Sequence, residues 1–387
     1  MKLQEVAQIV DCEHKTAPIT PNGQYFAVGT PAMRGNSINY SQARPISAKT
    51  FQEWTRRLKP RAGDILFARE APVGPVVQIP AEENIAPGQR TVLIRPGENI
   101  HGDYLFYLLT TPWMQRHVSS VAAGSTVPHL NVSDIRSLLL GELPDLNAQR
   151  SVGAVLRSLD DKIAANHRVI RTSIELAESL VSRSLTTGYT RLSDIATVTM
   201  GTSPKGEFLS EEITGLPFYQ GVRDFGEITP HQRIYTENPV REAEPGDILF
   251  AVRAPVGEVN IASEHTAIGR GLAAIRGVEH HNALFYLLRS RPEIWNMHQG
   301  SGTVFASINK TDLANASIPE IEMDSTDSSL LDELHREALT LTNQNITLAK
   351  TRDELLPLLM SGKITVREAS QEAAAAGAPI PGEENEV

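Results

Sequence analysis

The sequence is poor in the features that stabilise secreted or membrane proteins. It contains a single cysteine, Cys12, so no internal disulfide can form and no thiolate cluster can hold zinc or an iron–sulfur centre. No stretch approaches 18 consecutive apolar residues, and the first residues lack the apolar core of a signal peptide. These absences predict a cytoplasmic protein that does not enter a membrane.

Motifs for nucleotide and methyl-group chemistry are also missing. The segment Ser361-Gly362-Lys363-Ile364 lacks the first glycine and the hydroxyl of a phosphate-binding P-loop. The Asn-Pro-Pro-aromatic motif of adenine methyltransferases is absent, and the eleven histidines show no metal-ligand spacing. We therefore expect no catalytic residue, no bound metal ion and no bound cofactor in this chain.

One enzymatic alternative stays open on the sequence. Asp145, followed by Asp160 and Lys162, resembles the carboxylates and lysine of a metal-dependent nuclease. Such sites place the second acid and the lysine on a strand, whereas Asp160 and Lys162 fall in a predicted helix. Magnesium-dependent cleavage that is lost in Asp160→Ala would support this alternative.

The net charge of −10 gives no support for a nucleic-acid partner, because DNA phosphates are bound by lysine and arginine. The charge is unevenly distributed, however. Residues 320–387 carry a net −9, whereas residues 1–144 carry +2. The acidity therefore belongs mainly to the C-terminal sixth of the chain, and DNA binding by the rest is possible.

The most informative feature is an internal duplication. GDILFAREAPVG at 63–74 recurs as GDILFAVRAPVG at 246–257, with 10 of 12 positions identical. LFYLL at 105–109 returns at 284–288, and GSTVPHLNVSDI at 124–135 is echoed by GTVFASINKTDL at 302–313. The offsets of 178 to 183 residues indicate a tandem duplication of a whole domain with its trailing segment.

Each copy begins with a mixed α/β pattern and ends with a long helix. Between Asn147 and Leu185 there is no proline and one glycine, and apolar residues follow steps of three and four there and again from Ser328 to Met360. Two such narrow apolar seams favour mutual pairing as a coiled coil over separate packing on each domain. The predicted boundaries are 1–144 and 189–319 for two α/β (α+β) domains, 145–188 and 320–365 for the helices, and 366–387 for a disordered acidic tail.

Two asparagines occupy matching places in these helices. Asn166 and Asn345 are separated by 179 residues, which is the repeat offset, and both lie among the apolar seam positions. A polar residue at such a position often sets the register of a coiled coil at a cost in stability. We expect Asn166 and Asn345 either to meet near the middle of the helix pair or to lie solvated at its edge.

This combination resembles the specificity subunit of type I restriction-modification systems over residues 1–365. The resemblance rests on the paired GDIL and APVG blocks, on GSTVPHL and GSGTVFASI, and on PDLNAQRSVGAVLRSL at 144–159. It implies two target recognition domains that each read half of a bipartite DNA site, held apart by an antiparallel coiled coil. The second helix lacks a counterpart of Gln149, which puts symmetric docking of the methyltransferases in doubt.

The resemblance also implies the partners of the chain. These are double-stranded DNA, two methyltransferase subunits and restriction/translocase subunits, with no membrane partner. S-adenosylmethionine, ATP and magnesium are expected in the partner subunits, and this chain is expected to perform no chemistry itself. The alternative from another class is a protein-interaction scaffold that does not bind DNA, which accounts more easily for the net negative charge.

Base reading in the major groove uses arginine on guanine and asparagine or glutamine on adenine. Positions 69 and 70 differ from 252 and 253 although the flanking residues are identical, and two domains that read different bases should differ there. A solvated surface substitution explains the difference equally well. The candidate DNA-binding residues are Arg34, Asn36, Asn39, Arg69, Gln89 and Arg90 in the first domain, and Lys205, Gln220, Arg223, Arg253 and Arg270 in the second.

Overall fold

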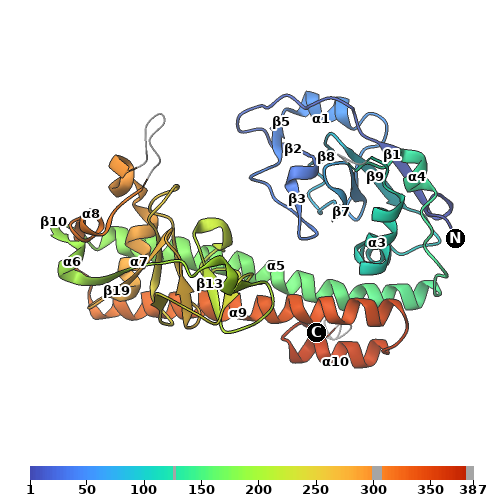
Figure 1. The fold of residues 1–387 in the computed structure, drawn as a ribbon. Coiled ribbons are helices and arrows are strands. Elements are labelled where there is room, and N and C mark those ends of the chain that lie inside the picture. The colour runs from blue at the N-terminus through green and yellow to red at the C-terminus, as the bar shows by residue number, and fades with distance from the viewer. Residues whose placement is uncertain (125–127, 299–306, 381–387) are drawn as a thin grey trace. The chain divides into compact units, whose positions relative to one another are not determined.

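A computed structural model describes residues 1–124, 128–298 and 307–380. The chain divides into two compact units: unit 1 combines Met1–Lys162 with Thr347–Val387, and unit 2 is Ile163–Ile346. The long helices α5 (Leu146–Arg183) and α9 (Ser325–Met360) each contribute to both units (Figure 1). Within the described residues, no helix has the length and apolar character needed to cross a bilayer.

Unit 1 is built around a four-stranded antiparallel sheet of order β1-β9-β6-β7. Its central strand carries the repeated GDIL block, and Leu66 and Ala68 pack into a core on one face, together with Val77 and Leu93. Helix α2 contacts β7 and β9 of the same sheet. Because the strand is covered on both faces, its sequence is a continuous apolar run rather than an alternating one.

A smaller sheet of order β5-β2-β8 packs beside this one, and in it β2 and β8 run parallel. The strands of unit 1 are β1 (Ala7–Asp11), β2 (Tyr25–Val28), β3 (Met33–Arg34), β4 (Ser37–Ile38), β5 (Arg44–Ile46), β6 (Ile65–Arg69), β7 (Val73–Gln78), β8 (Ile85–Pro87) and β9 (Thr91–Pro96). Its helices, apart from α5 and α9, are η1 (Leu3–Glu5), η2 (Thr30–Ala32), α1 (Ala48–Trp54), α2 (Gly102–Thr110), α3 (Pro112–Val121), α4 (Val132–Arg136) and α10 (Val366–Ala375).

Unit 2 repeats this plan. Its four-stranded sheet has the order β11-β19-β16-β17, and β13 and β18 form the parallel pair of a five-stranded sheet of order β12-β14-β13-β18-β15. The strands are β10 (Leu185–Arg191), β11 (Ala196–Met200), β12 (Leu209–Ser210), β13 (Leu216–Tyr219), β14 (Tyr235–Thr236), β15 (Glu242–Ala243), β16 (Ile248–Ala251), β17 (Val259–Ile261), β18 (Thr266–Ile268), β19 (Leu272–Gly277) and β20 (Ser317–Ile321). Its own helices are α6 (Leu192–Ile195), η3 (Gly206–Phe208), η4 (Val222–Asp224), α7 (His281–Ser290), η5 (Pro292–His298) and α8 (Lys310–Ala314).

The same ion pair anchors the central strand of both sheets. The aspartate of each GDIL block is buried and is held by an arginine from the neighbouring strand. Arg95 Nη2 lies 2.6 Å from Asp64 Oδ2, and Arg276 Nε lies 2.6 Å from Asp247 Oδ1. The duplication read from the sequence is therefore a duplication of tertiary contacts as well.

The two long helices pair antiparallel in each unit. In unit 2, Asn166 contacts Asn345 while Arg183 lies 3.5 Å from Asp327, so residue numbers rise along one helix as they fall along the other. In unit 1, Arg352 Nη1 lies 2.6 Å from Asp160 Oδ1. The predicted fold class, two tandem α/β domains with an antiparallel helix pair, is confirmed.

The structure differs from the predicted helix 145–188 at its end. Helix α5 stops at Arg183, and the following residues form β10, which pairs with β20 in a two-stranded sheet before α9 begins. Thr186 and Thr187 are β-branched and suit a strand, and Gly188 lies so close to the Glu320 carboxylate that a Cβ there would overlap it. The pairing of β10 with β20, which lies about 130 residues later in the chain, therefore sets the end of α5.

The predicted disordered tail also differs. Residues 366–375 form helix α10, whose N-terminus is capped reciprocally by the side chains of Thr365 and Glu368. Ala369 and Ala373 lie on one face of α10 and are buried, although the composition of the segment is polar. The prediction of disorder was wrong for 366–375 because a small-residue face can pack closely, and 381–387 lie outside the described residues.

Candidate nucleic-acid interface

Four segments of unit 1 meet at one end of its four-stranded sheet, and we call them edge 1. The amide of Cys12 donates to the carbonyl of Thr91, and the amide of Arg69 donates to the carbonyl of Arg90, at 3.3 and 3.0 Å. The amide of Leu130 donates to the carbonyl of Arg69 at 2.9 Å. Edge 1 comprises residues 11–14, 69–70, 89–90 and 129.

Unit 2 carries the equivalent arrangement, which we call edge 2. The amide of Gly201 donates to Leu272 and that of Val252 to Gly271, both at 2.9 Å. The amide of Ile308 donates to Val252 at 3.0 Å, as Leu130 does to Arg69 in the first copy. Edge 2 comprises residues 200–203, 252–253, 270–271 and 307.

The two edges share a backbone and differ in their side chains. The backbone of Glu70 pairs with that of His129 as an isolated antiparallel β-bridge in edge 1. The backbone of its counterpart, Arg253, pairs with that of Ser307 in the same way in edge 2. The strands that carry them keep the same pairing partners and nearly the same sequence. The pairs that differ include His14 and Ser203, Arg69 and Val252, Glu70 and Arg253, Gln89 and Arg270, and Arg90 and Gly271.

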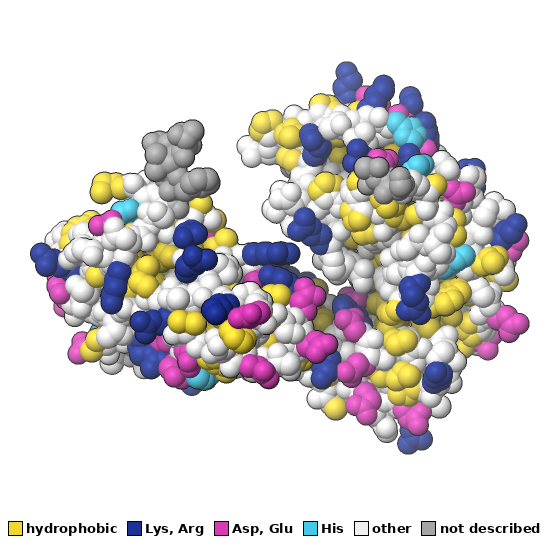
Figure 2. Space-filling view, in the orientation of Figure 1, with side chains coloured by type: hydrophobic (Ala, Val, Ile, Leu, Met, Phe, Trp, Pro, Cys, Tyr) yellow, Lys and Arg dark blue, Asp and Glu magenta, His cyan; other side chains and the backbone are white. Residues whose placement is uncertain are grey.

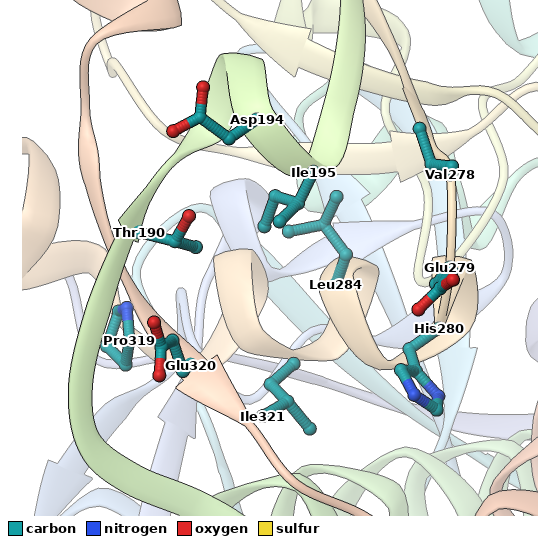
Figure 3. Close-up of a pocket in the computed structure, with 10 residues that line it drawn as sticks. All are labelled: Thr190, Asp194, Ile195, Val278, Glu279, His280, Leu284, Pro319, Glu320 and Ile321. Carbon is teal, nitrogen blue, oxygen red and sulfur yellow. The ribbon is translucent and has the colours of Figure 1, made fainter.

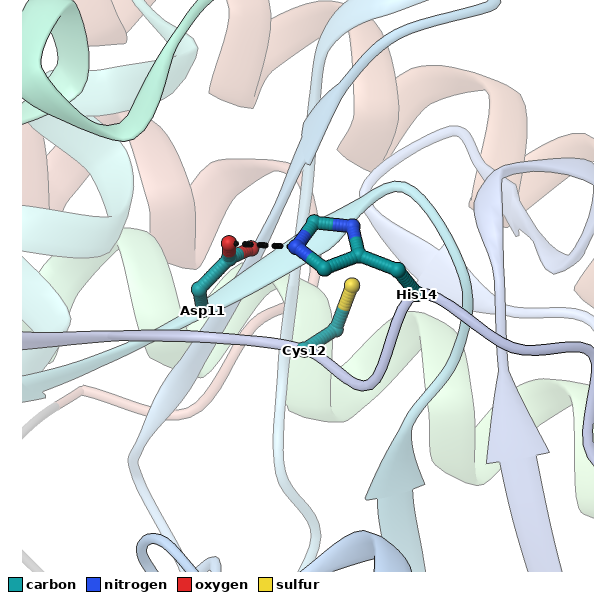
Figure 4. Close-up of side chains that lie close together, drawn as sticks. All are labelled: Asp11, Cys12 and His14. Atoms are coloured by element: carbon teal, nitrogen blue, oxygen red, sulfur yellow. Dashed lines mark hydrogen bonds and ion pairs between the residues drawn. The ribbon is translucent and has the colours of Figure 1, made fainter.

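In edge 1, Arg69 belongs to an internal polar network. Its guanidinium donates to the carbonyl of Leu130 at 3.2 Å and lies 3.3 Å from His14 Nδ1 and 3.7 Å from Asp11 Oδ1. His14 Nε2 lies 2.9 Å from Asp11 Oδ2 (Figure 4). With 15% of its side chain exposed, Arg69 holds the exposed imidazole of His14 in place rather than projecting outward.

Arg90 and Gln89 project from the same edge and are exposed. Arg90 has a φ of +69° and its side chain lies 3.4 Å from Glu70. Gln89 accepts a hydrogen bond of 3.1 Å from the hydroxyl of Thr16. Both contacts orient side chains that carry hydrogen-bonding groups suited to bases or phosphates.

The ligand atoms of Asp11, Cys12 and His14 lie within 4.8 Å of one another, a spacing a metal ion could use. The surroundings oppose a cation there, because the Arg69 guanidinium already contacts Asp11 and His14. Burial raises the pKa of the Cys12 thiol, which keeps it protonated. In the contacts that the structure describes, the cluster supports the His14 imidazole through hydrogen bonds.

Edge 2 lies beside Gln220, which contacts it through both its side chain and its backbone. Ser203 donates to Gln220 Oε1 at 3.3 Å and accepts from the amide of Arg270 at 3.2 Å. A Cβ added at Gly271 would overlap the Gln220 carbonyl, so only glycine permits this approach. The result is an exposed glutamine and an exposed arginine, Arg270, held side by side, with Arg253 exposed on the neighbouring segment.

The remaining predicted DNA-binding residues lie on exposed surface near these edges. The β3–β4 hairpin and the residue after it carry Arg34, Asn36 and Asn39, and the hairpin contacts β7. Gly29, which precedes the hairpin, lies against the backbone of Gln89 in edge 1. Lys205 and Arg223 flank edge 2, on the turns η3 and η4, and Lys205 lies 3.8 Å from Glu207. Segments 125–127 and 299–306, which hold part of the repeated glycine-led loops, lie outside the described residues.

Sequence reasoning missed three residues of the edges, Asp11, His14 and Ser203. They follow the first strand of each copy, where AQIVDCEH and ATVTMGTS share only the initial alanine. Nothing in the repeat marks these strands as equivalent. Their correspondence follows from the pairing of β1 with β9 and of β11 with β19.

At the centre of the helix pair, Asn166 Nδ2 donates to Asn345 Oδ1 at 2.8 Å and to Gln344 Oε1 at 2.8 Å. Asn166 is 2% exposed and Asn345 is 8% exposed. Of the two arrangements left open by the sequence, the described residues show the buried meeting.

The nuclease alternative does not fit the structure. Asp145 caps α5 by accepting the amides of Asn147 and Ala148, both at 2.9 Å. Both oxygens of Asp160 are engaged, one by the Tyr107 hydroxyl and one by Arg352, each at 2.6 Å. With about 15 residues of helix between them, Asp145 and Asp160 are roughly 22 Å apart and cannot share a metal ion.

Taken together, fold and edges define a duplicated α/β protein whose two copies present equivalent, chemically different loop edges beside an antiparallel helix pair. Comparisons with known proteins agree. The sequence profile described as "Type I restriction modification DNA specificity domain" matches residues 1–176 and again 187–350. The chain therefore belongs to the family of type I restriction-modification DNA specificity subunits, which recognise DNA sequences and are in general non-catalytic.

Two relatives come from Methanocaldococcus jannaschii. The protein assigned as the specificity subunit of the type I restriction enzyme MjaX is 29% identical over 79% of this chain and 79% of its own length. The MjaIX specificity subunit is 25% identical over 84% of this chain and 83% of its own length. The crystal structure of the type I system S subunit from M. genitalium shares the fold, with a TM-score of 0.58, 14% identity, and coverage of 93% and 95% of the two chains.

Proposed function

We propose that each unit reads one half of a bipartite, asymmetric DNA site, with edge 1 and edge 2 as the two reading surfaces. The observation that carries the proposal is the divergence of the edges on a shared backbone. In a duplicated scaffold with one shared task, the side chains at equivalent positions should match. Here Glu70 is replaced by Arg253 and Gln89 by Arg270, although the β6 and β16 strands are nearly identical in sequence and pair with equivalent strands, β9 and β19.

The chemistry of the edges supports base reading. An exposed arginine beside an exposed glutamine, as at Arg270 and Gln220, offers donors for guanine and a donor–acceptor pair for adenine. On the face shown in Figure 2, lysine and arginine are interspersed with aspartate and glutamate rather than forming one basic field. In this proposal, specificity comes from individual side chains at the edges.

The helix pair supplies the separation between the half-sites in this proposal. Helices of 38 and 36 residues are roughly 54 to 57 Å long at a rise of 1.5 Å per residue. Successive major-groove sites on one face of B-DNA lie about 34 to 36 Å apart. The helices are long enough to act as a spacer, and the buried Asn166–Asn345 contact sets their register.

The proposed assembly contains two methyltransferase subunits and restriction/translocase subunits. S-adenosylmethionine, ATP and magnesium would be held by those partners, and this chain would supply the sequence specificity. Family membership favours this function over a scaffold that does not bind DNA.

The test is a genome-wide map of N6-methyladenine in the source cell and in a strain that lacks only this chain. Loss of a single bipartite motif with an unspecified spacer of constant length is the expected result. It would identify the recognised sequence at the same time. An unchanged map, in cells shown to express both the chain and its methyltransferase, would contradict the proposal.

A further inference from the structure

The end of each four-stranded sheet opposite the edges carries a surface hollow, and the two hollows are equivalent. In unit 2 the hollow lies between α6, the loop from β19 to α7, and β20, with a volume of about 490 Å³. In unit 1 a hollow of about 440 Å³ lies between η1, β1 and the loop after β9. In each unit the first strand of the sheet, β1 or β11, runs from the hollow to the edge and spans roughly 13 Å, so the hollow is well separated from the edge.

The equivalence follows from strand pairing. Ala7 pairs with Pro96 in unit 1, and Ala196 pairs with Gly277 in unit 2. Counting two residues outward from these pairs aligns Glu5 with Asp194 and Glu98 with Glu279. Both hollows therefore carry a carboxylate before the first strand of the four-stranded sheet and another after β9 or β19, and unit 2 adds Glu320. In unit 1, Arg95 also lines the hollow with its guanidinium held by Asp64, and Glu5 accepts the amide of Lys2.

The hollow of unit 2 combines this acidity with apolar surface. In Figure 3, Asp194, Glu279 and Glu320 surround a floor that includes Ile195 and Leu284. Val278 at the margin is 74% exposed. Among the described residues, none of these carboxylates takes part in an ion pair, so their charge is available to a partner.

The carboxylates of the hollows and the phosphates of DNA are both negatively charged and repel each other. We therefore do not expect the hollows to bind the DNA that the edges read. The hollows keep their acids in both copies, whereas the edges at the other end of the same sheets change. A surface retained in both copies suits a partner that is the same for both units. A surface that differs suits the two halves of an asymmetric site.

We propose that each hollow binds a cationic segment, with lysine or arginine beside apolar side chains, of a methyltransferase subunit, one copy per unit. The inference rests on the proposed function, which supplies two such subunits. Electrostatic contacts of this kind act chiefly on the rate of association and weaken as salt is added. In unit 2 the apolar floor supplies the part of the affinity that salt does not reduce.

The test uses the full chain produced with the methyltransferase of its own system. Native mass spectrometry gives the stoichiometry, and binding is titrated at low and high salt. We expect two methyltransferases on the wild-type chain, and about tenfold or greater weakening of one binding step in Glu279→Lys and of the other in Glu98→Lys. Glu279→Gln, which removes charge without reversing it, should weaken binding less, and the salt dependence should shrink.

Matched controls are exposed glutamates away from the hollows, Glu212→Lys in unit 2 and Glu53→Lys in unit 1, which should bind as the wild type does. The unfolding midpoint of each variant shows that it is folded. Binding of two methyltransferases by every hollow variant within threefold of its control overturns the docking proposal alone. A wild-type chain that binds no methyltransferase overturns this proposal together with the proposed assembly.

Discussion

Asn166 on α5 donates a hydrogen bond of 2.8 Å to the side-chain oxygen of Asn345 on α9, at equivalent positions of the two copies. The Nδ2 atom of Asn345 is buried and has no hydrogen-bond partner among the described residues. A contact that satisfies only part of its polar groups lowers stability relative to an apolar seam. We propose that its value to the protein is the alignment of the two helices.

This relationship predicts a non-additive pair of substitutions. Asn166→Leu alone should lower the free energy of unfolding by about 1 to 3 kcal/mol, because it leaves Asn345 and Gln344 without their donor. In the double variant with Asn345→Leu, the free energy of unfolding should fall by clearly less than the sum of the losses in the two single variants. Urea unfolding of the four proteins measures the coupling, and additive losses would contradict the contact.

Asp160 should behave as a structural anchor and not as a catalytic acid. Asp160→Ala leaves the Arg352 guanidinium and the Tyr107 hydroxyl without their carboxylate, and the cost should be about 3 to 5 kcal/mol. The pKa of Tyr107 is raised by its burial and by Asp160, so the phenol stays protonated and donates. Chemical denaturation measures the loss.

The adjacent residue is the matched control. Asp161 is 60% exposed and pairs with Arg157 at 2.9 Å, a surface contact worth at most about 1 kcal/mol. Asp161→Ala should therefore change stability far less than Asp160→Ala. Equal effects of the two substitutions would show that Asp160 does not anchor the helix pair.

His335 predicts a pH dependence of stability. Burial, with His281 nearby, lowers the pKa of His335 to about 4, and its ring lies 3.2 Å from the Tyr286 hydroxyl. Between pH 6.5 and pH 4 the unfolded chain binds a proton at this residue that the folded chain does not. The contribution of the neutral His335 to the free energy of unfolding should therefore be fully present above pH 6.5. The free energy of unfolding should fall by up to about 3 kcal/mol as the pH drops to 4.

Replacing the ring isolates this contribution. His335→Gln should flatten the decline in unfolding free energy between pH 6.5 and pH 4, although it also changes the contact with Tyr286. His117→Gln, at a half-buried histidine of α3, is the comparison variant. The same slope in all three proteins would mean that other groups cause the acid sensitivity.

The edges predict that specificity divides between the units. Arg270→Ala should relax base discrimination in one half of the recognised site by about 1 to 3 kcal/mol and leave the other half unchanged. Arg90→Ala should affect only the opposite half. Methylation of a randomised site library by the assembled complex measures both, with Arg336→Ala on α9, 72% exposed, as the control. Loss of discrimination in both halves from one substitution would refute this division.

The helix pair predicts control of spacing. Inserting seven residues into both α5 and α9 in register lengthens each by roughly 10 Å and keeps the apolar seam continuous. The unspecified spacer of the methylated motif should change in length, and both half-sites should stay the same. A folded insertion variant that methylates the original motif would show that the helices do not set the spacing.

Features of this protein that leave a repeated or periodic pattern of residues could be predicted from its sequence. The duplication, the long helices and the family were readable because each leaves a repeated or periodic pattern of residues. The GDIL blocks are long apolar runs because their strands are covered on both faces, and that burial limits substitution. For the exposed candidate DNA-binding residues, from Arg34 to Arg270, the sequence indicated only residue types that can bind DNA and not their positions on the surface.

What only the tertiary structure decided depends on contacts between residues distant in the chain. The end of α5 is set by pairing of β10 with β20, and α10 forms because Ala369 and Ala373 find a surface to pack on. Arg69 turns inward because Asp11 and the Leu130 carbonyl lie within its reach. Local sequence determines periodicity and propensity, whereas the partner of each side chain is fixed only when the chain folds and brings its acceptors together.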